Sequence, residues 1–358
     1  MAYTADEKAL IWLSACTDLG TREKAALLRA APSPQILFEE FEKFYAQVIL
    51  KGQNGVYKEG GLAARERQVD DLLSEMSRKG YFAVTCLDAD YPEPLKAADP
   101  PIALFGAGNR ALLKEEKFCI VGSRVAPSWA EKLGTRISET LSNRFAIVTG
   151  LAEGGDLAAI KGALPSGKLI CVLPCGLDEC YPAAHMSVKE EIKRKGLLLS
   201  ELPFKERVHK GSFHARNLIL AGLSKGVLVL SAGEKSGALI TANFATDYGR
   251  DVFAFPYSLG FAHGTGCNAL IKKGAFLCTE ANDILDCYGI VLQEKKRIAL
   301  LPQEELILSA LKESERLHSA AIAEKTNLQI YEVAAFLSAL ELKGLVVKDG
   351  GNFFKYID

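Results

Sequence analysis

The sequence predicts an α/β protein whose central domain is a Rossmann-like, mostly parallel sheet. Short apolar runs rich in β-branched residues recur after residue 81, and amphipathic stretches of helical length separate most of them. Runs that are apolar on both faces are typical of strands covered by helices on both sides of a sheet. The flanking segments have different patterns, so we expect three domains, at 1–75, 76–292 and 298–358.

Composition limits the possible functions. Of the 358 residues, 49% are hydrophobic and 24% are charged, and the formal net charge is -1. Any attraction to nucleic acid must therefore come from a local basic site. No apolar run approaches the roughly 20 residues that cross a bilayer, and no secretory signal precedes the first helix. We therefore expect no membrane segment. The nine scattered cysteines include no CxxC pair, and several lie in apolar runs as free thiols do, so we expect a cytoplasmic protein.

One group of residues has the composition of a metal site but not its spacing. Cys171, Cys175, Cys180 and His185 are close in sequence, yet they match none of the usual zinc-ligand patterns. Cys171 also falls in the middle of a predicted strand. We expect neither a metal nor an organic cofactor.

The N-terminal domain is predicted to be helical. Leucines and isoleucines recur there at near-helical spacing, and Gly20 and Pro32 interrupt them. The glycine-rich stretch 52–61 is predicted to be an exposed loop. A further helix is expected over 65–79, with Gly80 as its C-terminal cap.

The central domain is expected to contain seven strands. A further stretch, Gly106-x-Gly108-x-x-Ala111, resembles a dinucleotide fingerprint, but the βαβ span and the ribose-binding acid do not follow, so we interpret it as a loop. The seven predicted strands are 82–87, 118–121, 146–148, 169–173, 197–199, 227–230 and 252–255.

After a charged linker at 294–297, the last domain is predicted to be a winged helix. Helices are expected over 304–311, 319–325 and 330–342, followed by a hairpin that turns at 349–351. The alternative is a bare helical cap with a frayed tail.

Three strand-to-helix turns carry residues suited to phosphate binding. The first is Gly122-Ser123-Arg124, where Gly122 would let a phosphate approach the backbone and Ser128-x-x-Glu131 would cap the next helix. The second contains Gly150 and the third contains Ser236-Gly237. The carboxyl ends of parallel strands meet at one sheet edge, so the helix N-termini after them can form a shared anion site.

No enzyme motif competes with this interpretation. The sequence contains no GxxxxGK[ST] phosphate loop, no GxSxG and no HExxH. These patterns favour a protein that binds a phosphate-bearing polymer over one that converts a small molecule.

Eight motifs follow one another in the central domain. They are GSR at 122–124, TGLAEGGDLAAIKGAL at 149–164, CVLPCGLDECYP at 171–182, LLSELP at 198–203, FHARNLILAGLS at 213–224, SGALITANFA at 236–245, GRDVFAFP at 249–256 and GCNALIKKGA at 266–275. Together they resemble the bacterial DNA-processing protein A (DprA, also called Smf) family. The similarity is strongest from residue 81 to 285, while 1–50 resemble that family's helical module related to sterile alpha motifs (SAM-like) and 298–358 its winged helix.

The resemblance implies an extended Rossmann fold that binds single-stranded DNA, forms a homodimer and loads the RecA recombinase onto incoming DNA during natural transformation. Leu270 and Ile271 match the dimerisation region of the family, so we expect an isologous apolar patch there. The residues that match the family's DNA pocket are Gly122, Ser123, Arg124, Gly150, Arg216, Asn217, Ser236, Gly237 and Thr241.

The chain also departs from the family pattern. Glu153 replaces an arginine, Leu218 replaces a second arginine, and Ile160 replaces a histidine. Ala183 stands where members often carry a basic residue. Fewer phosphate contacts reduce the salt-dependent part of DNA affinity, and Glu153 would repel the DNA backbone.

Two alternative functions stay open at this stage. One is an enzyme on the related fold of phosphoribohydrolases, although the glutamate of that group's PGGxGTxxE motif has no counterpart in the stretch 236–242. The other is a regulatory adaptor whose DNA pocket has decayed, which the missing arginines would explain.

Overall fold

The computed structural model describes residues 3–51, 61–98, 101–209, 211–291, 300–312, 314 and 316–357. The chain divides into two compact units, residues 1–292 and 293–358. The predicted linker at 294–297 and the predicted domain start at 298 lie outside the described residues. In the described ranges, no helix is long and apolar enough to cross a membrane.

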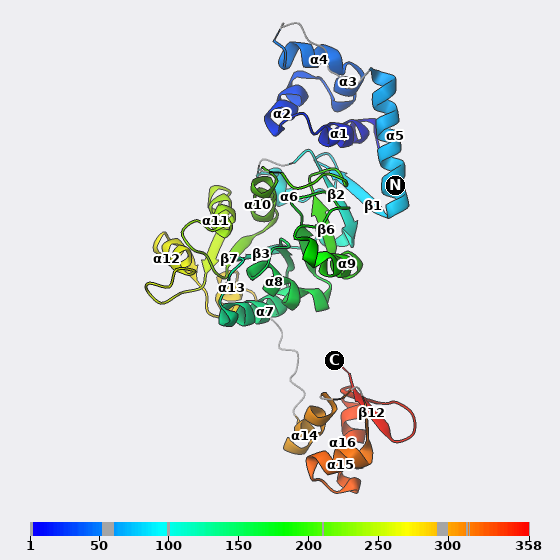
Figure 1. The fold of residues 1–358 in the computed structure, drawn as a ribbon, viewed down its shortest axis with the longest axis vertical. Helices are drawn as coiled ribbons and strands as arrows, with labels where there is room; N and C mark the ends of the chain where they lie inside the picture. The colour runs from blue at the N-terminus through cyan, green and yellow to red at the C-terminus, as the bar shows by residue number, and fades with distance from the viewer. Residues whose placement is uncertain are drawn as a thin grey trace. The chain divides into compact units, whose positions relative to one another are not determined.

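A nine-stranded sheet forms the centre of the first unit, in the order β1-β2-β6-β5-β4-β3-β7-β8-β9 (Figure 1). Every neighbouring pair from β6 to β9 is parallel, while β1 and β2 are antiparallel additions at one edge. The predicted α/β class is therefore confirmed. The strands are β1 (Tyr81–Thr85), β2 (Ala103–Gly108), β3 (Lys117–Val121), β4 (Ala146–Thr149), β5 (Leu169–Val172), β6 (Leu197–Ser200), β7 (Gly226–Val229), β8 (Asp251–Ala254) and β9 (Phe276–Leu277).

Helices cover both faces of this sheet (Figure 1). Alternate residues of β3 divide between two cores: Phe118 and Ile120 belong to one, Cys119 and Val121 to the other. This alternation follows from the period of two in a strand, and it explains why the strands are apolar throughout. The first core lies under α7 (Ser128–Ser142), α8 (Gly155–Ala163), α9 (Met186–Lys195) and α13 (Ala281–Cys287), and the second under α6 (Glu93–Lys96), α10 (Ser212–Leu223), α11 (Gly237–Asp247) and α12 (Thr265–Lys272).

The N-terminal helices belong to the same compact unit as the sheet. The predicted boundary at residue 75 falls inside α5, which continues to Gly80, a left-handed cap with a φ of 66°. Tyr3 also links the two parts, because its hydroxyl oxygen accepts a hydrogen bond of 2.9 Å from the backbone N–H of Ala83 in β1. The helices are α1 (Ala5–Ala15), α2 (Thr21–Ala30), α3 (Pro34–Glu39), α4 (Phe41–Val48) and α5 (Leu62–Lys79).

Two local predictions are wrong. The stretch around Gly106 is not a loop but strand β2, in which Gly106 lies opposite Phe82 of β1. A side chain at position 106 would overlap the Phe82 ring, so a glycine occupies a regular strand position. Ser128 is not a helix cap either: Pro127 occupies the cap position of α7, and Ser128 is the first helical residue.

The second unit has the helices and hairpin expected of a winged helix. Its strands form a three-stranded antiparallel sheet in the order β10-β12-β11, and Lys348 pairs with Phe354 beside the predicted turn. Its elements are α14 (Pro302–Lys312), β10 (Leu317–His318), α15 (Ser319–Thr326), α16 (Ile330–Leu342), β11 (Val346–Lys348) and β12 (Phe353–Tyr356).

We expect the first unit to fold without the second. The two units have separate apolar cores, so removal of residues 293–358 exposes no core side chain of the sheet domain. Circular dichroism and urea unfolding of the shortened chain should show a cooperative transition with little change in midpoint. A broad transition or loss of the folded signal would contradict the division into two independent units.

Candidate functional site

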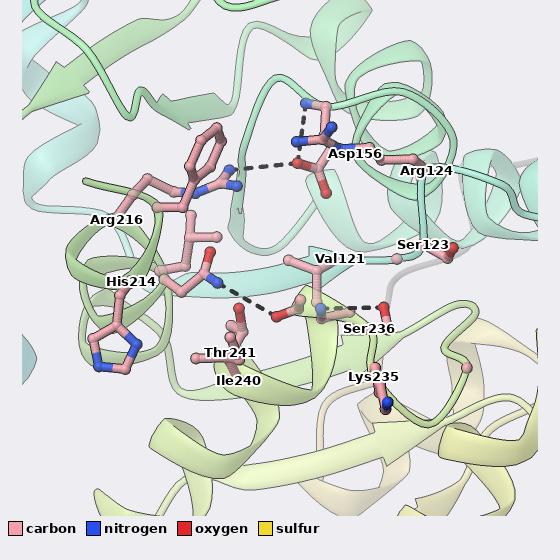
Figure 2. A pocket seen from close by; sticks show the side chains of 18 of the residues that line it. Val121, Ser123, Arg124, Asp156, His214, Arg216, Lys235, Ser236, Ile240 and Thr241 are labelled. Atoms are coloured by element: carbon pink, nitrogen blue, oxygen red, sulfur yellow. Dashed lines mark hydrogen bonds and ion pairs between the residues drawn. The ribbon is translucent and has the colours of Figure 1, made fainter. Parts of the chain in front are cut away.

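A pocket of about 510 Å³ lies at the carboxyl edge of the parallel strands. The turns after β3 and β7 and the helices α10 and α11 bring its lining residues together (Figure 2). Of the nine pocket residues predicted from the sequence, all but Gly150 line it: Gly122, Ser123, Arg124, Arg216, Asn217, Ser236, Gly237 and Thr241.

The turn that follows β3 is held by backbone contacts to its neighbours. The N–H of Ser123 donates a hydrogen bond of 2.7 Å to the carbonyl of Ser231, beyond the end of β7. A Cβ atom at position 122 would lie 2.9 Å from the Cα of Gly155, the first residue of α8. Gly122 therefore allows two turns of the protein to touch, a role different from the predicted close approach of a phosphate.

A buried ion pair forms the floor of the pocket. Nη1 of Arg216 lies 3.4 Å from Oδ2 of Asp156, and both side chains are almost fully buried (Figure 2). Gly150, the one predicted residue that does not line the pocket, lies directly against this pair. A Cβ atom at position 150 would overlap the Arg216 guanidinium. Gly150 is thus required for the position of Arg216 without lining the pocket itself.

Asp156 and Arg216 differ in whether their buried polar atoms have hydrogen-bond partners. Asp156 accepts hydrogen bonds from the N–H groups of Ala152 and Gly122 as well as from Arg216. Burial nevertheless raises the pKa of Asp156 above its ordinary value, because the interior disfavours the carboxylate charge. On Arg216, the buried Nε has no hydrogen-bond partner among the described residues. A buried donor without a partner is unusual in a folded protein.

Arg124 lies at the exposed rim of the pocket, as its place directly after a strand predicts. Its guanidinium lies 5.9 Å from the ring centre of Tyr181 and 5.8 Å from that of Phe213, distances typical of cation–π contacts. Among the described residues Arg124 forms no salt bridge, so its charge is available to a ligand.

The third turn forms the opposite wall. Oγ of Ser236 accepts a long hydrogen bond of 3.4 Å from the N–H of Ala238, so Ser236 caps α11. Nδ2 of Asn217 donates to the Gly237 carbonyl, also at 3.4 Å, and connects α10 to this wall (Figure 2). The start of α11 therefore faces the pocket with the positive end of the helix dipole.

Four further polar residues line the pocket that the sequence analysis did not single out as ligands. Asp156 is the buried partner of Arg216, Lys235 adds a cation beside Ser236, and His214 and His263 contribute imidazole rings. The adjacency of Lys235 to the SGALITA motif was the one available signal in the sequence. The others become neighbours of the site only through the fold.

The family model described as DNA recombination-mediator protein A matches residues 82–289. The chain belongs to this family. A second model, described as the DprA winged helix domain, matches residues 294–352, in agreement with the predicted C-terminal domain.

Individual relatives extend this similarity. The DNA processing protein DprA of Streptococcus pneumoniae is 40% identical over 220 residues, which cover 61% of this chain and 78% of the relative. Protein Smf of Escherichia coli is 32% identical over 326 residues, covering 84% and 86%.

Two solved structures of family members are also similar. The X-ray structure of DprA from S. pneumoniae has a TM-score of 0.65 and 32% identity, and it covers 82% of this chain and all of that one. A structure from Helicobacter pylori, reported for the single-stranded DNA binding mode of its DprA, has a TM-score of 0.53 and 32% identity, covering 59% and 97%.

The departures from the DprA pattern lie in different surroundings. Glu153, which replaces an arginine, is 62% exposed and lies 3.7 Å from Nε2 of His185. Nδ1 of His185 contacts the Leu151 carbonyl at 2.8 Å, so this nitrogen must carry the proton. Ile160 is buried in the first core, where its methyl groups pack against apolar neighbours. The remaining departures are Ala183, in a short 3₁₀ turn, and Leu218, half-buried on α10.

The cysteines noted in the sequence make contacts with backbone carbonyls. Sγ of Cys171 donates to Gly150 at 3.1 Å, and Sγ of Cys180 to Pro182 at 3.2 Å. Burial raises the pKa of Cys175 to about 11, which keeps its thiol protonated. No group of three or more potential ligands that could hold a metal is found in the described ranges.

The residues expected at a DprA-type dimer interface are largely internal. Leu270 is buried in the second core, and Ile271 is half-buried against it. The exposed apolar side chains nearby belong instead to Phe276 and Leu277 of the edge strand β9.

Proposed function

We propose that this chain is a non-enzymatic recombination mediator that binds single-stranded DNA in the pocket at the carboxyl edge of its sheet. The observation that carries the proposal is the exposed guanidinium of Arg124, which forms no salt bridge with any described residue, at the rim of a pocket that Lys235 and the start of α11 also line. Family membership and the single-stranded DNA binding reported for the H. pylori relative give independent support.

The pocket has the chemistry of a backbone-binding site. Arg124 and Lys235 supply positive charge on opposite walls, and the amides at the start of α11 face the space between them. Such contacts hold phosphates without reading base identity. Binding is therefore expected to be independent of sequence and sensitive to salt.

An enzymatic role is less well supported by the pocket. Asp156 is the one carboxylate among its described lining residues, and its oxygens already accept hydrogen bonds from Arg216 and backbone amides. A general acid or base needs a free position within hydrogen-bond reach of the substrate. Asp156 is thus poorly placed to act as the catalytic acid of a phosphoribohydrolase, which favours binding over hydrolysis of a nucleotide.

The proposal includes two partners, a second copy of the chain and the RecA recombinase. Both are what the family resemblance implies, and membership in a family of recombination mediators supports them. The exposed residues of β9 are the surface we assign to self-association, because an edge strand offers unpaired backbone groups together with apolar side chains. Light scattering that shows only monomer at concentrations of tens of micromolar would contradict the dimer.

The first test removes the exposed guanidinium. We expect Arg124→Ala to weaken single-strand binding equally for all sequences and to reduce the slope of log affinity against log salt by about 0.7, the value for one phosphate contact. Fluorescence anisotropy with labelled oligonucleotides at several salt concentrations measures both quantities. An unchanged slope would show that Arg124 makes no phosphate contact.

The second test restores the charge that the family pattern leads us to expect. Glu153→Arg should strengthen single-strand binding, since it removes an exposed negative charge near the pocket and adds a positive one. Glu153→Gln is the matched control and should give a smaller gain. If all three proteins bind equally, residue 153 lies outside the DNA path.

A further inference from the structure

Three aromatic side chains form a cluster at the same sheet edge as the pocket. The rings of Tyr257 and Phe261 stack with centres 5.5 Å apart and an angle of 1°. Trp129, in the first turn of α7, lies 5.0 Å from Tyr257 at an angle of 50°. Trp129 is 46% exposed and Phe261 is 37% exposed. Two large aromatic rings that contact Tyr257 are thus partly open to solvent.

The inner member of the cluster is held rigidly. Asn268 hydrogen-bonds both the N–H and the carbonyl of Tyr257, at 3.0 and 2.9 Å, and the Tyr257 hydroxyl donates to the Leu230 carbonyl at 2.6 Å. A side chain at Gly264 would overlap the Tyr257 ring, so glycine leaves the space that the ring occupies. A ring fixed in this way loses little conformational entropy when a ligand stacks on the cluster.

The cluster is continuous with the pocket through Ser231. The carbonyl of Ser231 accepts the hydrogen bond from Ser123, and its Oγ donates to the His263 carbonyl at 2.8 Å. His263 lines the pocket and its ring lies 5.8 Å from that of Phe261. Ser231 therefore connects the turn after β3 to the loop that carries Tyr257 and Phe261.

We propose that Trp129, Tyr257 and Phe261 form a platform on which bases of a bound single strand stack, beyond the phosphates held in the pocket. This inference rests on the proposed single-strand binding and names a further part of its footprint. Exposed aromatic rings beside a cationic groove are the combination with which proteins bind single strands without sequence preference. Paired bases in a duplex do not offer their faces, so the platform also selects single strands.

Native fluorescence gives a first test that the unmodified chain can provide. The chain has two tryptophans, and Trp12 is buried in the N-terminal helical core. A single strand that stacks on Trp129 should quench its emission on titration with a thymidine oligonucleotide of about 20 residues, long enough to cover a typical single-strand site. Trp12→Phe should keep this quenching, and Trp129→Phe should abolish it.

Affinity distinguishes the platform from the pocket. We expect Trp129→Ala/Phe261→Ala to bind the thymidine oligonucleotide about tenfold more weakly than the wild type, the effect of losing one to two stacked bases. The salt slope should stay the same, because no phosphate contact is removed. An abasic oligonucleotide of equal length has the phosphates without the bases and should bind both proteins equally.

The outcomes separate the two proposals. If anisotropy shows single-strand binding while Trp129 emission and the double-variant affinity stay unchanged, the platform is overturned and the pocket stands. Equal losses for the thymidine and abasic oligonucleotides would also overturn the platform, because stacking would not be their cause. If the wild type binds no single strand at all, both proposals fail.

Discussion

Replacing Arg216 by alanine is expected to lower the free energy of unfolding by about 3–5 kcal/mol, the usual cost of leaving a buried charge without its partner. Asp156 would stay buried in the floor of the pocket, where burial already raises the pKa of its carboxyl group. Urea unfolding measures the loss directly. A change below about 1 kcal/mol, as for an exposed ion pair, would show that solvent reaches Asp156.

The same substitution should abolish single-strand binding, so stability and binding need to be separated. In Arg216→Met/Asp156→Asn both charges are removed together, which avoids the cost of an unpaired buried charge, and the amide oxygen at position 156 can still accept hydrogen bonds from the N–H groups of Ala152 and Gly122. We therefore expect the double variant to fold and yet to bind DNA weakly. If it binds like the wild type, the buried donor of Arg216 has no part in the site.

Gly155→Ala is expected to destabilise the protein by about 3 kcal/mol, at the upper end of the usual cost of overpacking. A Cβ atom at position 155 would overlap Cα of Gly122 and lie 2.6 Å from its backbone nitrogen. Neither backbone can move freely, because the turn after β3 is tied to Ser231. Thermal and urea unfolding of the variant measure this effect.

Gly237→Ala is the matched control for this substitution. Like Gly155, Gly237 is the first residue of a helix, here α11, but no atom lies within 4 Å of its Cβ position. Alanine there should keep or slightly raise the stability, by up to about 1 kcal/mol, because it restricts the unfolded chain. Equal losses for the two variants would mean that backbone contact at Gly155 is not the cause.

The strands of the central sheet could be predicted because burial on both faces leaves an apolar run in the sequence. The exceptions have physical reasons. In β2, Gly106 leaves room for the Phe82 ring. Because glycine is typical of loops, its presence led to the wrong prediction of a loop at a regular strand. Strand β9 has two residues, Phe276 and Leu277, both exposed at the edge of the sheet. Two exposed residues are too few to leave a recognisable pattern of hydrophobicity in the sequence.

The site was predictable where it depends on one turn and hidden where it depends on the fold. Arg124 follows a strand directly, so its place at the sheet edge could be inferred from the sequence. The pairing of Arg216 with Asp156 joins residues 60 positions apart, and Gly150 has its role only beneath that pair. The aromatic platform likewise brings Trp129 next to Tyr257 by packing alone.

The most direct test of the central claim is the affinity of the full chain for single-stranded and double-stranded oligonucleotides of the same length, measured across a series of salt concentrations. We predict tighter binding of the single strand, with no dependence on sequence and a slope of log affinity against log salt of about -1.4 or steeper, corresponding to phosphate contacts from Arg124 and Lys235. Equal affinity for the duplex, or single-strand binding that does not respond to salt, would contradict the claim that this pocket holds the phosphates of single-stranded DNA.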